Sequence, residues 1–232
     1  MRPDDIPEIQ TLDLFADMTS AHFQELIKAA YLQTFPPRVD LISEGDQADF
    51  LHILVSGSVE LFSTWDHQVA SMATVHPVSS FILAATIKNG PYLMSARTME
   101  KSRIVLLPST DVRRIFDRDP NFARSVVREL ARCYRSVVKD TKNLKLRSSL
   151  ERLANYLIRS HLQSNEAMTF ELTIEKRQLA SFLDMTPESL SRAIKSLRSY
   201  GVKFDGAGVT ITDMDALRTL AKPSPLIDDY ST

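Results

Sequence analysis

Hydrophobic and polar positions in the first half of the chain follow the pattern of short strands. Between about residues 31 and 107, apolar runs alternate with turn residues: residues 41–42 precede Glu44-Gly45-Asp46, and residues 50–55 precede Ser56-Gly57. Apolar runs of this length, bounded by such turns, are typical of antiparallel strands. The pattern predicts an all-β domain, which we bound at residues 10–118.

The pattern changes to a helical one near residue 119. Residues 121–146 contain neither glycine nor proline, and apolar side chains recur four, three and four positions apart at Val126, Leu130, Cys133 and Val137. Such a seam forms where a helix pairs with a second helix, and also where a helix packs on its own core. We predict a long helix over residues 119–146 and keep both interpretations of its seam.

A short amphipathic helix is predicted over residues 186–197. Thr186 can cap its first turn, and Pro187 suits the first helical position because proline lacks only an amide that would be unpaired there. One set of side chains recurs at helical spacing and should face a core: Leu190, Ala193, Ile194 and Leu197. The other set should point outward: Glu188, Ser191, Arg192 and Lys195.

The segments around this helix predict a winged helix-turn-helix. An apolar run through Leu179 and Ala180 precedes it across a short connector, and a Gly206-Ala207-Gly208 turn after it separates two strand-like runs. A further helix with Leu153 and Leu157 opens this part. We assign residues 147–220 to the winged domain and residues 221–232 to a tail.

The exposed side chains of the 186–197 helix have the chemistry to read duplex DNA. A glutamate can accept a hydrogen bond from cytosine, and an arginine can donate two to guanine. We therefore predict that Glu188, Ser191 and Arg192 contact bases. The predicted contacts to the DNA backbone are Lys176, Arg177, Thr186, Ser189, Lys195 and Lys203. The alternative is an ordinary helix pair with a solvated charged face.

Composition narrows the class of protein. The chain has 232 residues, 44% hydrophobic content and a net charge of -1, so any DNA affinity must come from a local patch. It has no apolar run of about 18 residues and no signal peptide, so we expect a cytoplasmic protein without a membrane partner. Since the sequence contains no nucleophile elbow, phosphate-binding glycine loop or zinc-protease motif, we do not expect an enzyme.

Two motifs resemble the CRP/FNR family of bacterial transcription factors. They are the run EGDQADFLHILVSGSVELF, residues 44–62, and the pattern Glu188-x-x-Ser191-Arg192. The resemblance covers about residues 10–220. It implies an α+β fold: an antiparallel β-barrel of the cyclic-nucleotide-binding, jelly-roll type, a dimerisation helix and a winged helix-turn-helix. It also implies a homodimer, RNA polymerase as a partner, and palindromic DNA sites with TTG-type half-sites.

The expected effector site departs from the family members that bind cyclic AMP. Those members carry Gly-Glu-Leu and Arg-Ser-Ala segments, whereas this chain has residues 78–82 and Met94-Ser95-Ala96. We predict an effector pocket at Ser79, Ser80, Phe81, Met94 and Ser95. Because a methionine replaces the phosphate-binding arginine, we expect no tight binding of cyclic AMP. The iron–sulfur cluster of FNR is excluded because no cysteine precedes Cys133.

The sequence leaves the signal open. Family branches without either signature include haem-dependent sensors, and an axial haem ligand is usually His, Cys, Met or Tyr. His76 is the preferred candidate, and the others are His22, His52, His67, Met72 and Met94. Cys133 is interpreted as a small buried hydrophobe in preference to a thiol sensor. The alternative function is a non-catalytic β-domain interaction protein with a degenerate DNA-binding tail.

Overall fold

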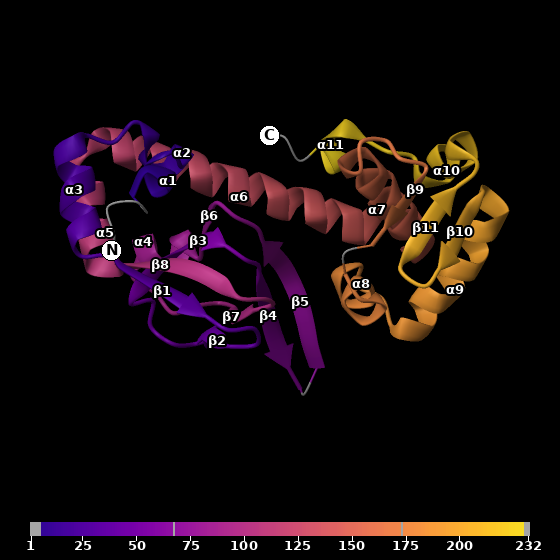
Figure 1. Ribbon diagram of the computed structural model, residues 1–232, viewed down its shortest axis with the longest axis horizontal. Helices are drawn as coiled ribbons and strands as arrows, with labels where there is room; N and C mark the ends of the chain where they lie inside the picture. Colours follow the sequence, from indigo (N-terminus) through magenta and orange to yellow (C-terminus); the bar gives the residue numbers. More distant parts are fainter. Residues whose placement is uncertain (1–5, 67, 173, 230–232) are drawn as a thin grey trace. The chain divides into compact units, whose positions relative to one another are not determined.

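The computed structural model describes residues 6–66, 68–172 and 174–229 and divides the chain into two compact units between Arg132 and Cys133 (Figure 1). The division falls inside one continuous helix, α6 (Pro120–Leu146). This helix confirms the predicted long helix. No described helix is both long and apolar enough to cross a membrane.

The first unit contains two antiparallel sheets of four strands each, in the orders β1-β8-β3-β6 and β2-β7-β4-β5. These orders are those of a double-sheet jelly roll. Among the described residues, each strand pairs only with strands of its own sheet, so the predicted closed barrel was wrong and the sheets have open edges. The strands are β1 (Tyr31–Phe35), β2 (Asp40–Ile42), β3 (Phe50–Ser56), β4 (Val59–Trp65), β5 (Gln68–Val75), β6 (Ser79–Phe81), β7 (Ser95–Thr98) and β8 (Ser102–Pro108).

Strand β3 shows why its sequence is a nearly continuous apolar run. Side chains on a strand point alternately to opposite faces. Leu51, Ile53 and Val55 belong to the core beneath the helices, whereas Leu54 belongs to the core between the two sheets. Both faces of the strand are therefore buried, and no position except the central His52 is polar within the buried stretch.

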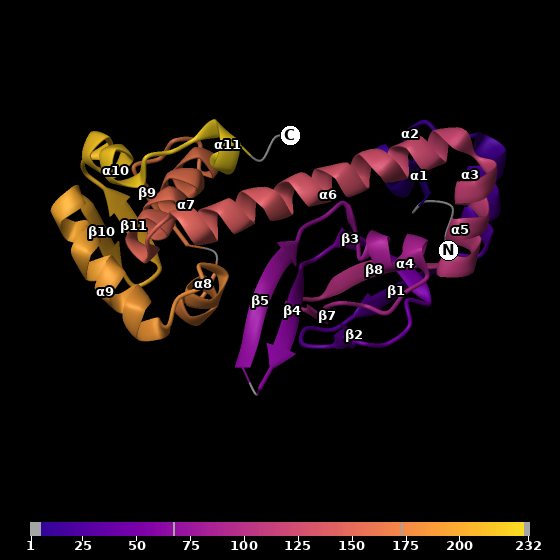
Figure 2. The same cartoon turned by 180° about the vertical axis from the view of Figure 1, so that it is seen from behind.

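Helices that the sequence did not predict cover the jelly roll (Figures 1 and 2). Phe15 packs against Phe23 with ring centroids 5.7 Å apart and against Phe122 of α6 at 6.0 Å. The N-terminal helices thus share one core with the start of α6. The unpredicted helices are α1 (Ile6–Gln10), α2 (Asp13–Ala16), α3 (Ser20–Lys28), α4 (Leu83–Lys88) and α5 (Ser109–Arg118).

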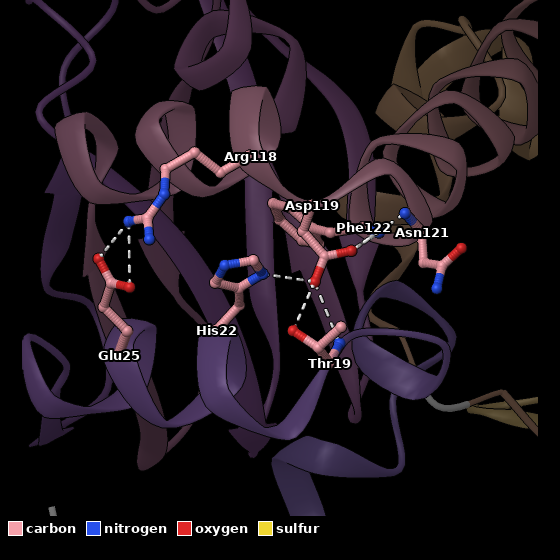
Figure 3. Close-up of polar contacts among 7 residues, drawn as sticks. All are labelled: Thr19, His22, Glu25, Arg118, Asp119, Asn121 and Phe122. Carbon is pink, nitrogen blue, oxygen red and sulfur yellow. Dashed lines mark hydrogen bonds and ion pairs between the residues drawn. The ribbon is translucent and has the colours of Figure 1, made fainter.

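Asp119 fixes the beginning of α6 (Figure 3). One carboxylate oxygen accepts hydrogen bonds from the amides of Asn121 and Phe122 at 3.0 and 3.1 Å, which caps the helix. The other accepts from the amide and hydroxyl of Thr19, and lies 2.9 Å from Nδ1 of His22. Burial alone would raise the pKa of Asp119, but these hydrogen bonds outweigh it and hold the pKa well below its usual range.

The second unit confirms the predicted winged helix-turn-helix. Its three-stranded antiparallel sheet has the order β10-β11-β9, and α8 and α9 form the helix-turn-helix. The elements are α7 (Ser149–Gln163), β9 (Thr169–Glu171), α8 (Lys176–Phe182), α9 (Pro187–Leu197), a 3-10 turn (Arg198–Tyr200), β10 (Val202–Asp205), β11 (Gly208–Ile211), α10 (Met214–Ala221) and α11 (Pro225–Asp228).

Two local contacts stabilise the wing and the C-terminal tail of this unit. Gly201 enters the wing with φ +74°, and a Cβ there would lie 2.7 Å from the Asp213 amide nitrogen, so only glycine fits. In the tail, Asp228 of α11 accepts two hydrogen bonds of 2.6 Å from the guanidinium of Arg147 just after α6. The described part of the tail is therefore tied to its own unit.

Candidate nucleic-acid interface and effector pocket

Helix α9 has the start and the buried face that the sequence predicts. The Thr186 hydroxyl accepts a hydrogen bond of 3.1 Å from the Ser189 amide, so the helix has a side-chain cap and begins at Pro187. Its inner face is buried in the core of the second unit through Leu190, Ala193 and Leu197. This packing leaves the opposite face to solvent.

The three predicted base-reading residues lie on that exposed face. Glu188, Ser191 and Arg192 are all exposed, and the Arg192 guanidinium donates a 3.1 Å hydrogen bond to the Ser189 hydroxyl. A hydrogen bond from its own amide, and then the Thr186 hydroxyl, lower the pKa of Glu188, so this carboxylate is ionised at neutral pH. A donor and an acceptor suited to base edges therefore stand within the first turns of one helix.

The cations predicted to contact the DNA backbone lie on three elements of the second unit. Lys176 and Arg177 are exposed in the first turn of α8, Lys195 on α9 and Lys203 on β10. Ser189 is half-buried, and its hydroxyl accepts hydrogen bonds from Thr186 and Arg192. The cations can contact phosphates without reading sequence.

Two of the five predicted effector residues line a pocket. Ser79 and Ser80 line a pocket of about 240 Å³ in the first unit. Phe81 instead belongs to the core between the sheets. The pocket is also lined by residues that were not predicted from the sequence, from the α1–α2 segment and α6: Thr11, Leu12, Asp13, Leu14, Glu129 and Arg132.

Met94 and Ser95 lie outside the lining of this pocket. Met94 packs against the core between the sheets, and the Ser95 hydroxyl accepts a 3.0 Å hydrogen bond from the Glu44 amide. The next arginine along β7, Arg97, pairs with Asp40 at 2.6 Å and stacks over Phe62. Of the five predicted effector residues, only Ser79 and Ser80 therefore line this pocket, and a site shared by all five stays a prediction.

The candidate haem ligands lie in different surroundings. His76 is exposed and is not part of the lining of the pocket at Ser79 and Ser80. His22 bonds to Asp119, and His67 lies outside the described residues. His52 is 4% exposed between the rings of Phe81 and Tyr92, and burial lowers its pKa to about 4.

The exposed apolar side chains of α6 differ from the predicted seam at two of its four positions, 126 and 133. Val126 is fully buried in the core of its own unit, so it cannot face a second copy. Cys133 is exposed, contrary to its interpretation as a buried hydrophobe. Val127, Tyr134 and Val137 are exposed at 59%, 70% and 61%, and Leu130 is half-buried against the core of the first unit. These four residues, 127, 130, 134 and 137, form the exposed stripe of α6.

Comparisons with known proteins match both units. A family profile described as a cyclic nucleotide-binding domain matches residues 32–119, and one described as a Crp-like helix-turn-helix domain matches residues 151–220. The chain is 22% identical over 215 residues to a "CRP-like cAMP-activated global transcriptional regulator" of Mycobacterium tuberculosis (strain CDC 1551 / Oshkosh), covering 90% of this chain and 96% of that protein.

A second relative and a solved structure are also similar to most of the chain. The chain is 21% identical over 186 residues to the "Fumarate and nitrate reduction regulatory protein" of Salmonella typhi, covering 78% of this chain and 74% of that protein. A crystal structure described as a transcriptional regulator of the crp/fnr family from Eubacterium rectale superimposes with a TM-score of 0.74 at 18% identity, covering 91% of this chain and 99% of that chain. The Mycobacterium tuberculosis protein and the Eubacterium rectale structure are described as transcriptional regulators, and the Salmonella typhi protein as a regulatory protein.

Proposed function

Because the chain belongs to the CRP/FNR family of transcriptional regulators, with a cyclic nucleotide-binding domain and a Crp-like helix-turn-helix domain, we propose that it binds palindromic DNA as a symmetric homodimer under the control of a small ligand. The observation that carries this proposal is the exposed Glu188, Ser191 and Arg192 on the capped α9. The promoter-bound dimer would then act on RNA polymerase.

The proposed reading assigns each side chain a base partner. Arg192 donates to O6 and N7 of the guanine in a TTG half-site, and Glu188 accepts from the N4 amino group of a cytosine. Ser191 contacts a neighbouring base edge. Lys176, Arg177, Lys195 and Lys203 hold the phosphates, with Thr186 and Ser189 at the helix N-terminus.

The dimer is proposed to form along the exposed stripe of α6. Residues 127, 130, 134 and 137 repeat at three-four-three spacing, which suits pairing with the same helix of a second copy. A dimer that reads two half-sites must hold its α9 helices about 34 Å apart. A ligand that alters this separation would change DNA affinity without touching DNA.

Gel-shift titration tests the proposed function. We expect a complex with a palindromic duplex containing TTG half-sites that is tighter than the complex with a scrambled duplex and weakens steeply as salt increases. The titration is repeated with protein purified from cells and with extracts of small molecules added. Absence of a sequence preference under every condition would support the interaction-protein alternative.

The effector is proposed to bind in the pocket lined by Ser79, Ser80 and Glu129. Its charged side chains are two carboxylates, Asp13 and Glu129, and one guanidinium, Arg132, which lies 2.7 Å from Glu129. An anionic ligand would meet a lining of net negative charge. The pocket therefore favours a small polar ligand that is neutral or cationic.

Cyclic AMP is expected not to bind tightly. Its phosphate would have to be desolvated, and the position of the family's phosphate arginine holds Met94, a partly buried thioether on the core between the sheets. Isothermal titration of the protein with cyclic AMP should give no heat of binding at micromolar concentrations. Micromolar or tighter binding would contradict this prediction and place the effector site elsewhere in the first unit.

A further inference from the structure

Arg152 is a buried cation that the DNA-reading face does not use. Its side chain lies near the start of α7, and the residue is 8% exposed. The guanidinium donates to the Leu183 carbonyl at 2.9 Å and to the Asp184 carbonyl at 3.0 Å. On its other side it donates to the carbonyls of Arg147 at 3.0 Å and Leu144 at 3.4 Å.

These four acceptors belong to the ends of two different helices. Leu144 lies in the last turn of α6, with Arg147 directly after it, and Leu183 and Asp184 follow the last residue of α8. Carbonyls at a helix C-terminus lack partners within the helix and carry partial negative charge. A guanidinium can serve two such ends at once because its donors form a rigid planar fork, which an ammonium group lacks.

The contact lies directly before the recognition helix. Asp184 adopts a left-handed backbone conformation with φ +52°, and Thr186, two residues later, caps α9. A hydrogen bond between the Met185 amide and the Ala180 carbonyl closes the same turn. Any shift of Leu183 and Asp184 against α6 therefore moves the first residue of α9.

A second polar residue of α7 also donates to a carbonyl at the C-terminal end of a helix. Asn155, one turn after Arg152, donates a 2.6 Å hydrogen bond to the carbonyl of Ala221, the last residue of α10. The inner face of α7 thus holds the C-terminal ends of three helices. Of Arg152 and Asn155, only Arg152 connects the helix-turn-helix to α6, and α6 also supplies Phe122 and Val126 to the core of the first unit.

We propose that Arg152 is a positioning residue: it fixes the helix-turn-helix turn to the end of α6 and so sets the placement of α9 in the DNA-binding dimer. The proposal rests on the proposed function, because placement matters only where two recognition helices engage one palindrome. Two linked binding sites gain affinity only when their geometry permits simultaneous engagement. Arg152 therefore affects the affinity gained by binding the second half-site, and the affinity for a single half-site does not depend on it.

The test compares affinities for a palindromic duplex and a duplex with one half-site, using the full chain. The variants are Arg152→Met and the milder Arg152→Lys, and the matched control is Arg218→Met, which removes an exposed guanidinium from α10 of the same unit. We expect the ratio of palindrome affinity to half-site affinity to fall by about tenfold or more in Arg152→Met. Arg152→Lys should give a smaller fall, and Arg218→Met should leave the ratio unchanged.

Hydrogen exchange of the DNA-free protein supplies a second readout. In Arg152→Lys, amides at residues 144–147 and 183–186 should exchange faster, while those of α9 and the wing should keep their protection. Equal losses on both duplexes in Arg152→Lys, or uniformly faster exchange across the second unit, would show a merely structural role and overturn the proposal. If the unmodified protein does not prefer the palindrome, the proposed function fails, and the exchange pattern alone decides whether Arg152 holds the two helix ends.

Discussion

Replacing Asp119 by asparagine is expected to lower the free energy of unfolding of the first unit by about 2–4 kcal/mol at pH 7. The buried carboxylate accepts hydrogen bonds from the amides of Thr19, Asn121 and Phe122 and from the Thr19 hydroxyl. An asparagine keeps one acceptor oxygen but turns an NH₂ group toward donors, so some of these groups lose their partner. Urea unfolding followed by circular dichroism measures the loss.

Asp17→Asn is the matched control for this prediction. Asp17 makes a 3.0 Å ion pair with Arg128 of α6, but both side chains are more than half exposed, so its removal should cost less than about 1 kcal/mol. The two variants make the same chemical change and the same change in charge. Equal losses in both would show that Asp119 has no special role in anchoring α6.

The contribution of Asp119 should also depend on pH in one direction. Its pKa in the folded protein is lower than its ordinary value of 3.8, so the unfolded chain takes up the proton first as the pH falls. The stability difference between the unmodified protein and Asp119→Asn should shrink as the pH falls below about 4. A difference that grows below this pH would contradict the assignment.

Arg192→Ala is expected to cost about 1–3 kcal/mol of binding free energy on a palindromic TTG duplex and to relax the preference at one base pair of each half-site. The guanidinium is exposed on α9 and rests on the Ser189 hydroxyl, from which it can turn to a guanine. The measurement is the fluorescence anisotropy of labelled duplexes in which each half-site position is varied in turn.

Lys203→Ala provides the comparison for Arg192→Ala. Lys203 is exposed on β10 of the wing and is assigned to phosphate contact. Its loss should weaken cognate and scrambled duplexes alike and reduce the salt dependence by about one counterion. If Arg192→Ala also weakened both duplexes equally, the base-reading assignment would be wrong.

The recognition helix could be predicted from sequence because its signals are local. Thr186 and Pro187 mark the start of α9, Gly201 marks the entry to the wing, and the apolar spacing selects the buried face. The same reasoning found β3 but missed α1 to α3. Those helices are short, and they are stabilised by contacts between Phe15, Phe23 and Phe122 that are distant in sequence.

The errors in α6 have a related cause. A spacing of four, three and four predicts an apolar seam but does not say whether the seam meets its own core or a second chain. Val126 enters the core with Phe122, and the exposed stripe begins one position later at Val127. The Asp119-Pro120 pair could have predicted the start of α6, because an aspartate before a proline is typical of a capped helix. The hydrogen bonds from Thr19 to Asp119 could not, because they depend on the tertiary fold.

The residues missed in the pocket and around Arg152 were also beyond local reasoning. Thr11 and Asp13 reach the pocket only because the N-terminal helices pack beside β6 and α6. Arg152 resembles a surface residue in an amphipathic helix until the ends of α6 and α8 meet it. Charged residues that serve helix ends leave no spacing pattern of their own.

The boundary between the two units falls within the hydrogen-bonded turns of α6 and not within a loop. In a helix, one inserted residue turns everything downstream by about 100° and advances it by about 1.5 Å. The number of residues between Val126 and Leu144 therefore determines the direction of the side chains at the end of α6 as well as their distance along the helix. Seven added residues would nearly restore the original direction of the side chains that follow them on the helix, whereas two would turn those side chains almost to the opposite face.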